Sequence, residues 1–311
     1  MSPFLLSTQS IVFRYLLEVK VRVLSQDFDY KAQKGFNFCF TSDWHLEAAA
    51  HNRRKLKQDL DHAKKTDCRV YVNGDIFDLI LPGDMKRYVK ANDLSKGQAV
   101  INETIQNAFE FIEPYIDIID GIGVGNHESS TVKYHSVDPV AWLIQRMNEK
   151  RDKALPPIHH MGYSGYLIMN FHHGEHRSIR RLKIWYHHGV GGSSPVTKGM
   201  IDINRAVYSN EADLYWMGHK HTAAIDPGIE RLYLDSKNQP YVKTLKAFYT
   251  AGYHGGMIHE QVRGTEYVPD FSTERFLSRS SSGSVFMSVH LCSAHTGTGY
   301  AIETSLTTGQ S

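Results

Sequence analysis

The sequence is poor in cysteine, in net charge and in long apolar runs, and each shortage excludes a class of protein. Its three cysteines, Cys39, Cys68 and Cys292, are widely spaced without a CxxC pair, which indicates reduced thiols rather than a disulfide framework. A net charge of +2 provides no strong basic field that would by itself indicate nucleic-acid binding. Residues 1–24 mix charged with apolar positions, so no run is long enough for a signal peptide or a membrane span. We therefore expect a soluble, cytoplasmic protein with no membrane span.

Histidine, in contrast, is abundant, and several of the 18 histidines fall in short clusters with acidic residues. Five clusters recur in a fixed order: Asp43-Trp44-His45, Gly74-Asp75-Ile76-Phe77-Asp78, Gly125-Asn126-His127-Glu128, His187-His188-Gly189 and Gly218-His219-Lys220-His221. Oxygen donors come early, imidazoles come late, and most clusters directly follow a hydrophobic run. Together they supply enough ligands for two divalent cations that share one site. A hydrolytic metalloenzyme is therefore the leading interpretation.

Hydrophobic periodicity predicts a layered α/β chain. In the first half it predicts strands at 13–23, 36–41, 69–72 and 116–124, and helices at 51–65 and 98–113. In the second half it predicts helices at 142–150 and 200–210, strands at 166–172, 182–187 and 214–217, a hairpin of 231–234 with 241–249, and a last strand pair near 285–291 and 300–306. In such sheets the ligand site lies beyond the carboxyl ends of the strands, where the clusters fall.

The chain shows no internal repeat and no long low-complexity linker, so we expect one domain over residues 1–311. A polar turn at 174–178 is expected to join the strands at 166–172 and 182–187 as an antiparallel pair, and a loop is expected at 272–284, which is rich in Ser and Arg. The polar insertion at 81–97 is placed where it could cover the site.

The first two clusters offer carboxylate ligands, and each has an ordinary structural alternative. Asp43 and His45 can reach one cation with an oxygen and a nitrogen, although this cluster taken alone favours Asp43 as a helix N-cap. The glycine before Asp75 allows a tight exit from the strand, and the two carboxylate oxygens of Asp75 can bridge two metals. Asp78 is either an acceptor for a ligating imidazole or a capping residue, and the sequence leaves both open.

The later clusters add a neutral oxygen and imidazoles. Asn126 offers a carbonyl oxygen that keeps the negative charge of the site down, and His127 beside it is a candidate to touch substrate. Glu128 either orients His127 or is a solvated loop carboxylate. His219 and His221 lie two residues apart after a strand, so both rings can approach one metal pair from the same side.

The order D-x-H, G-D-x-x-D, G-N-H-E, H and G-H-x-H resembles the calcineurin-like metallophosphoesterase superfamily over about residues 36–221. The resemblance implies a four-layer α/β/β/α sandwich, with two mixed sheets flanked by helices and with the strands of 230–306 completing the second sheet. It also implies that Asp43, His45 and His221 hold one metal, that Asp75 bridges, and that Asn126, His219 and a histidine of the fourth cluster hold the other. Manganese is the ion that the resemblance favours, with iron, zinc or cobalt as alternatives.

The choice between His187 and His188 stays open at the level of sequence. Adjacent residues at a strand end point to opposite faces, so one ring ligates and the other packs elsewhere. The histidine-glycine pair that is frequent in the superfamily favours His188, whereas its H-x-G variant would favour His187. We adopt His188 as the predicted ligand.

The expected activity is hydrolysis of a phosphodiester or a small phosphorylated compound by a metal-activated hydroxide, with Asn126 and His127 also contacting the substrate and His127 assisting departure of the alcohol. A DNA or RNA nuclease is the first alternative, and a non-enzymatic interaction module is the second. Basic stretches at 51–57 and 176–183 could hold a phosphate backbone, although a solvated helix face and a hairpin turn are preferred. His254 is either a substrate-contacting histidine or part of a glycine-rich turn. No obligate protein partner is evident.

Overall fold

The structure is a computed structural model that describes residues 21–30, 35–48, 51–80, 100–172, 180–192, 197, 199–253, 261–263, 266–268, 283–293 and 300–309. Its strands are β1 (Arg22–Asp29), β2 (Gly35–Thr41), β3 (Cys68–Val72), β4 (Ile119–Gly123), β5 (His159–Gly162), β6 (Ser164–His172), β7 (Arg180–His187), β8 (Leu214–Met217), β9 (Ala224–Leu234), β10 (Pro240–Tyr249), β11 (Gln261–Arg263), β12 (Glu266–Val268), β13 (Val285–Ser293) and β14 (Tyr300–Thr308). Its helices are α1 (Arg53–Lys65), α2 (Val100–Ile112), α3 (Asn126–His135), α4 (Pro139–Lys150), α5 (Met200–Ser209) and the 3₁₀ helix η2 (Glu113–Ile118).

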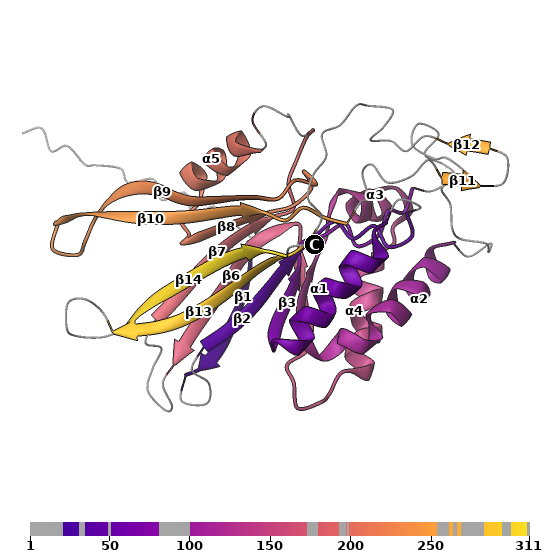
Figure 1. The fold of residues 1–311 in the computed structure, drawn as a ribbon, viewed down its shortest axis with the longest axis horizontal. Helices are drawn as coiled ribbons and strands as arrows, with labels where there is room; N and C mark the ends of the chain where they lie inside the picture. Colours follow the sequence, from indigo (N-terminus) through magenta and orange to yellow (C-terminus); the bar gives the residue numbers. More distant parts are fainter. Residues whose placement is uncertain are drawn as a thin grey trace, which may run out of the picture.

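Twelve of these strands form two six-stranded sheets, both of them mixed (Figure 1). One sheet has the order β14-β13-β2-β3-β4-β5, with parallel pairing from β2 to β5 and antiparallel pairing of β14, β13 and β2. The other has the order β1-β6-β7-β8-β10-β9, in which β7, β8 and β10 run parallel. Within the described residues no helix has the length and apolarity needed to cross a membrane.

Three apolar cores separate four layers. The first lies between α1, α2 and α4 and the outer face of the β2–β5 sheet, and it includes Leu56 and Val70. The second fills the space between the sheets, where Phe40 of one sheet packs against Trp216 and Phe248 of the other. The third lies between α5 and the outer face of the second sheet. The expected α/β/β/α sandwich is therefore confirmed, with helices on both outer faces (Figure 1).

Local sequence explains where the helices start. Asn52 caps α1 by accepting a hydrogen bond from the backbone N–H of Lys55 (3.1 Å), which satisfies one of the free donors of the first turn. Asp138 does the same for α4 by accepting from Ala141 N (2.9 Å), and Pro139 occupies the first helical position. The helix predicted at 142–150 therefore begins earlier, at Pro139.

The structure differs from the expectations at four further places. The strand predicted at 116–124 is shorter, because residues 113–118 form the 3₁₀ helix η2, with Pro114 in its first turn. The helix α3 directly after β4 was not predicted, and neither was the strand over most of β1. The strands of 230–306 do not all complete one sheet, since β9 and β10 join β8 while β13 and β14 join β2.

Several expectations fall outside the described residues. These are most of the strand at 13–23, the insertion at 81–97, the turn at 174–178, His254 and most of the loop at 272–284. Of the cysteines, Cys39 and Cys68 are free and buried.

Candidate metal centre

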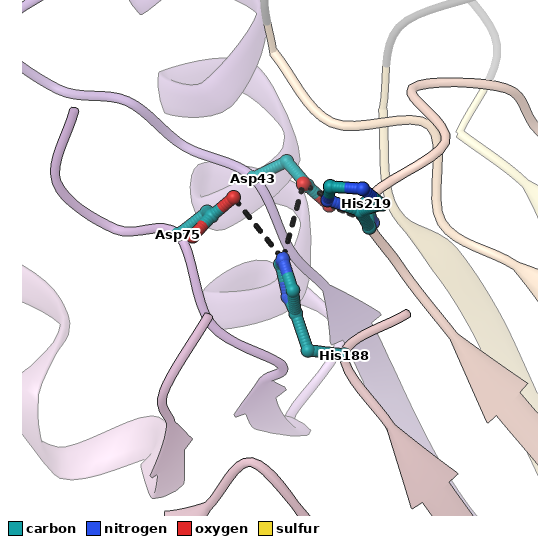
Figure 2. A group of neighbouring side chains, drawn as sticks. All are labelled: Asp43, Asp75, His188 and His219. Carbon is teal, nitrogen blue, oxygen red and sulfur yellow. Dashed lines mark hydrogen bonds and ion pairs between the residues drawn. The ribbon is translucent and has the colours of Figure 1, made fainter. Parts of the chain in front are cut away.

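The candidate ligands lie close together at the carboxyl ends of five strands. Asp43 follows β2, Asp75 follows β3 and Asn126 follows β4 in the first sheet, while His188 follows β7 and His219 follows β8 in the second. Parallel neighbours end at the same edge, and the packing of the two sheets brings both edges together. Figure 2 shows Asp43, Asp75, His188 and His219 converging on one point. One ligand atom of each lies within 4.8 Å of the others.

A second group overlaps the first. It consists of Asp43, His45 and His221, whose ligand atoms also lie within 4.8 Å of one another. The His221 Nε2 atom is 3.6 Å from Asp43 Oδ1, and His45 Nε2 is 3.9 Å from Asp75 Oδ2. Asp43 therefore belongs to both groups, while Asp75 contacts an imidazole of each. The two groups have the shared carboxylates that a pair of neighbouring cations requires.

His188, and not His187, enters the cluster. The His188 ring is buried, with Nε2 at 3.1 Å from Asp75 Oδ2 and at 3.2 Å from Asn126 Oδ1. Its Nδ1 donates to the carbonyl of Asn73 (2.7 Å), which leaves Nε2 directed at the oxygen ligands. The ring of His187 instead stacks on Trp185 at a centroid distance of 5.6 Å, and its Nδ1 accepts from the backbone N–H of Gly189.

Asp78 acts as an acceptor for imidazoles. Its Oδ1 lies 3.2 Å from His45 Nδ1 and 3.3 Å from His127 Nδ1, which corresponds to the first of the two roles that the sequence left open. The backbone carbonyl of Asp78 lies 2.5 Å from the same His127 nitrogen. The backbone N–H of His127 donates to Asp75 Oδ1 (3.0 Å). His127 is thus held at both its ring and its backbone, on the edge of the candidate ligand cluster.

Glu128 has neither of the roles expected for it. It is fully buried, and its carboxylate accepts hydrogen bonds from the backbone N–H groups of Gly125 (2.8 Å), Asp75 (3.1 Å) and Phe77 (3.0 Å). It therefore ties the loop after β3 to the start of α3. The sequence did contain a signal, because a glutamate three residues after the residue that precedes a helix has capping-box spacing.

Backbone strain is concentrated at the candidate ligands. The φ angles of Asp43, His45, Asp75, His219 and His221 lie between +45° and +70°, the left-handed region that non-glycine residues rarely adopt. Each such residue costs on the order of 1–3 kcal/mol and persists only where its surroundings fix it. Here the fixing contacts include His45 N to Asp75 O (3.0 Å) and His219 N to Asp43 Oδ2 (2.9 Å). Strain of this kind is typical of functional sites.

Two glycines allow the turns after β3 and β4 to approach closely. A Cβ atom on Gly125 would lie 2.0 Å from Asp75 Oδ1, and one on Gly74 would lie 2.4 Å from the backbone nitrogen of Gly125. Side chains at these positions would separate the two turns and move Asp75 away from Asn126.

Asp75 and the imidazoles around it shift one another's pKa values. Burial opposes ionisation of Asp75, but the positive charges of His188, His127 and His45 outweigh it and hold the Asp75 pKa well below its usual range. Burial likewise lowers the pKa of His188, yet the Asp75 and Asp43 carboxylates raise it overall to about 9. For His45, a hydrogen bond to Asp78 and the carboxylates outweigh burial and raise the pKa to about 10.

The donor set fits two divalent cations. Neighbouring imidazoles favour the charged form of the buried Asp75 carboxylate, and a cation could take over that part. Carboxylate, amide and imidazole ligands suit manganese, iron, zinc and cobalt alike. The structure therefore supports a metal-binding cluster of Asp and His residues.

Residues that the sequence did not single out support the centre. The Glu47 carboxylate accepts from the backbone N–H groups of Asp78 (2.8 Å) and Leu79 (2.7 Å), which holds the loop after β3. Ser42 donates to the Asp43 carboxylate and lies 2.5 Å from the hydroxyl of Thr250. Apart from the contact between the neighbours Ser42 and Asp43, these partners lie far apart in sequence, and no local pattern marks them.

The basic stretch at 51–57 lies on α1 and has acidic partners. Lys55 pairs with Asp59 at 3.0 Å and Lys57 pairs with Asp61 at 2.7 Å. This arrangement agrees with the preferred reading of a helix face. In the other basic stretch, residues 176–179 lie outside the described part of the chain.

No protein-family model matches the chain, and no curated protein matches it. Three solved structures are similar in outline. A Thermotoga maritima protein shares 13% identity with a TM-score of 0.31, over 88% of this chain and 99% of that one. A Streptococcus pneumoniae protein described as a predicted phosphoesterase shares 10% with a TM-score of 0.28, over 88% and 98%. GAP50, the anchor in the inner membrane complex of Plasmodium, shares 11% with a TM-score of 0.35, over 88% and 84%. At these TM-scores the similarity assigns no function to this chain, and the fold and the centre rest on its own residues.

Proposed function

We propose that the protein is a dinuclear metal-dependent hydrolase of phosphoester bonds, of the calcineurin-like metallophosphoesterase type, acting on a phosphodiester or a small phosphorylated compound. The observation that supports this most strongly is the pair of overlapping ligand groups, Asp43-Asp75-His188-His219 and Asp43-His45-His221, at the ends of strands from two sheets. Two groups that share a carboxylate are the arrangement expected for two neighbouring cations. Manganese is the first ion to test.

The ligand roles are those that the resemblance implies. One cation would be held by Asp43, His45 and His221, and the other by Asn126, His188 and His219, with Asp75 between them. The Asp75 Oδ2 atom lies 3.1 Å from His188 Nε2 and 3.9 Å from His45 Nε2, which supports that place for Asp75. Two divalent ions in such a site supply charge neutralisation for phosphoryl oxygens and lower the pKa of water.

His127 is the proposed residue for contact with the substrate. Its Nδ1 is engaged by the carbonyl and carboxylate of Asp78, so Nε2 is the atom left to face a phosphoryl or leaving oxygen. A positioned imidazole that donates a proton to a leaving alcohol contributes about 10²- to 10⁴-fold in rate. Asp78 would hold that ring in one orientation, and the half-buried amide of Asn126 lies at the start of the same helix.

The test is reconstitution followed by a substrate panel. The protein is stripped with a chelator, loaded with manganese, zinc, iron or cobalt, and assayed on monoesters, a nitrophenyl diester, nucleotides and DNA. We expect hydrolysis that depends on two bound ions and is absent in Asp75→Asn. His127→Ala should keep its metal and lose most turnover, while His135→Ala, at the exposed far end of α3, serves as the matched control.

Two outcomes would contradict the proposal. If the protein binds no divalent ion, the ligand assignment is wrong. If it binds two ions and hydrolyses no ester, the interaction-module alternative replaces the enzyme. Cleavage confined to DNA or RNA, with a steep dependence on salt, would redirect the same chemistry to the nuclease alternative.

A further inference from the structure

A buried lysine lies between the candidate ligands His219 and His221. The Nζ atom of Lys220 donates to three consecutive backbone carbonyls of residues 190–192, at 2.7, 3.3 and 2.8 Å. It also pairs with the carboxylate of Asp202, in the first turn of α5, at 3.1 Å. An ammonium group has three donors, and four acceptors surround this one. The lysine side chain thus contacts another loop and a helix instead of the candidate ligands beside it.

These contacts connect two ligand-bearing turns. Residues 190–192 follow His188 after one intervening residue, Gly189, while Lys220 belongs to the turn that carries His219 and His221. The two turns already touch, because Gly218 N donates to His188 O (2.9 Å), and a Cβ atom on Gly189 would lie 2.7 Å from the Cβ of His219. Lys220 adds an anchor on the outer side of this junction.

The turn that carries Lys220 needs such an anchor. Lys220 N donates to Gly218 O (2.8 Å), and the residue between them, His219, has φ of +70°. A hydrogen bond from residue i+2 to residue i around a positive φ is a γ-turn of the rare, strained kind. His221, two residues further on, has φ of +49°. Backbone in this region persists only when the surrounding structure fixes it.

We propose that Lys220 is a positioning residue for the metal centre, in which its ammonium group holds the turn at 188–192 against the turn at 218–221. In this role it keeps His188, His219 and His221 at the spacing that metal binding needs. The inference rests on the proposed function as far as the centre binds metal, but it concerns metal affinity and not the reaction.

The direction in which metal affinity changes on loss of Lys220 distinguishes a positioning role from a purely electrostatic one. A lysine near a cation site repels the cation, so loss of its charge alone would tighten metal binding. Loss of positioning would weaken it. Residues that orient metal ligands typically change affinity by about 10- to 100-fold when they are replaced.

The experiment compares Lys220→Met with Lys246→Met in the full-length chain. Lys246 also donates to a backbone carbonyl, that of Thr304 (2.6 Å), but its strand partner is Leu214, at the start of β8, whereas the ligands follow the end of that strand. Cobalt is titrated into metal-free protein and followed by visible absorption, with thermal unfolding measured in parallel. We expect roughly 10-fold or greater loss of affinity in Lys220→Met and no comparable loss in Lys246→Met.

Unchanged or tighter cobalt binding in Lys220→Met would overturn the proposal, and so would equal losses in both variants. If Lys220→Met does not fold, Asp202→Asn is used instead, because it weakens the same anchor and keeps the lysine. This variant should lose cobalt affinity to a smaller extent than expected for Lys220→Met. Unchanged cobalt affinity in Asp202→Asn would also overturn the proposal. Because cobalt binding is the readout, a wild-type protein that binds cobalt but hydrolyses nothing would refute the enzyme and leave this test intact.

Discussion

Metal binding should release protons, and the number can be worked from the site. The pKa of His188 is raised to about 9 and that of His45 to about 10, so both rings carry a proton at neutral pH in the metal-free protein. Metal ligation requires neutral imidazole, so binding must displace these protons. The same carboxylates stabilise both protons and the two charged rings repel each other, so together they hold fewer protons than the two pKa values taken singly indicate. We expect release of between about one and two protons per centre at pH 7.

The pH dependence follows with a definite sign. Below the raised pKa values, each displaced proton makes apparent affinity rise about tenfold per pH unit. Affinity should therefore increase between about pH 6 and pH 8 and level off as the pH passes about 9 to 10. The pKa of His188 is raised from 6.5 to about 9, so its ring holds a proton roughly 3 kcal/mol more tightly than an ordinary imidazole does. At low pH the metal must displace this proton before it can bind.

Calorimetric titration in buffers of different ionisation enthalpy measures the released protons directly. The control is His188→Gln, which removes one of the two protonated rings and should reduce the number. Affinity that is flat from about pH 6 to pH 8, with no proton release, would refute the reasoning, because it would mean that the imidazoles are already neutral or do not ligate.

Three other perturbations test the centre and the fold. Gly125→Ala places a Cβ 2.0 Å from Asp75 Oδ1, so this variant should lose metal binding, as measured by equilibrium dialysis. Gly192→Ala is the control, because a Cβ there meets open space, and it should keep metal binding. Equal behaviour of the two variants would show that close approach of the turns is unimportant. His188→Ala should bind one ion fewer in elemental analysis while His187→Ala keeps both, and the reverse result would exchange their roles. In the metal-free protein, the histidines with raised pKa contribute stability that is complete below their unfolded value of about 6.5 and is lost as the pH rises through about 9 to 10. The thermal midpoint should therefore fall over that window, and a midpoint that rises there would contradict the assignment.

The sequence was sufficient to place the candidate ligand clusters, because each of them follows closely after a strand. Residues 36–41 are apolar at nearly every position, so both this strand and its end just before Asp43 could be predicted. Leu214 to Met217 was predicted with the bounds that the structure shows. The antiparallel pairing of β6 with β7 was likewise predicted from two apolar runs around a polar turn, and it is confirmed.

The features that the sequence did not predict depend on contacts with residues that are distant along the chain. The burial of Glu128 follows from the loop after β3 folding over the start of α3; the capping-box spacing marks a helix start but does not report this contact with the loop. Most of β1 was missed because its alternation is weak, and its strand character depends on parallel pairing with β6. The helix α3 was missed because its residues have little amphipathic pattern, with only Glu128 and Thr131 buried. Such elements are set by tertiary contacts rather than by local preference.

The position of the centre across two sheets has a consequence for how the protein matures. Asp43, Asp75 and Asn126 come from the sheet built largely by the first half of the chain, whereas His188, His219 and His221 come from the second sheet. During synthesis the early carboxylates are made long before the imidazoles that complete the cluster, and they meet only when the inter-sheet core has packed. In the proposed metal-bound protein, metal would load after the sheets have docked, and the bound ions would then stabilise the docked sheets by mass action. The concentration of free metal would thus set the stability of the folded chain.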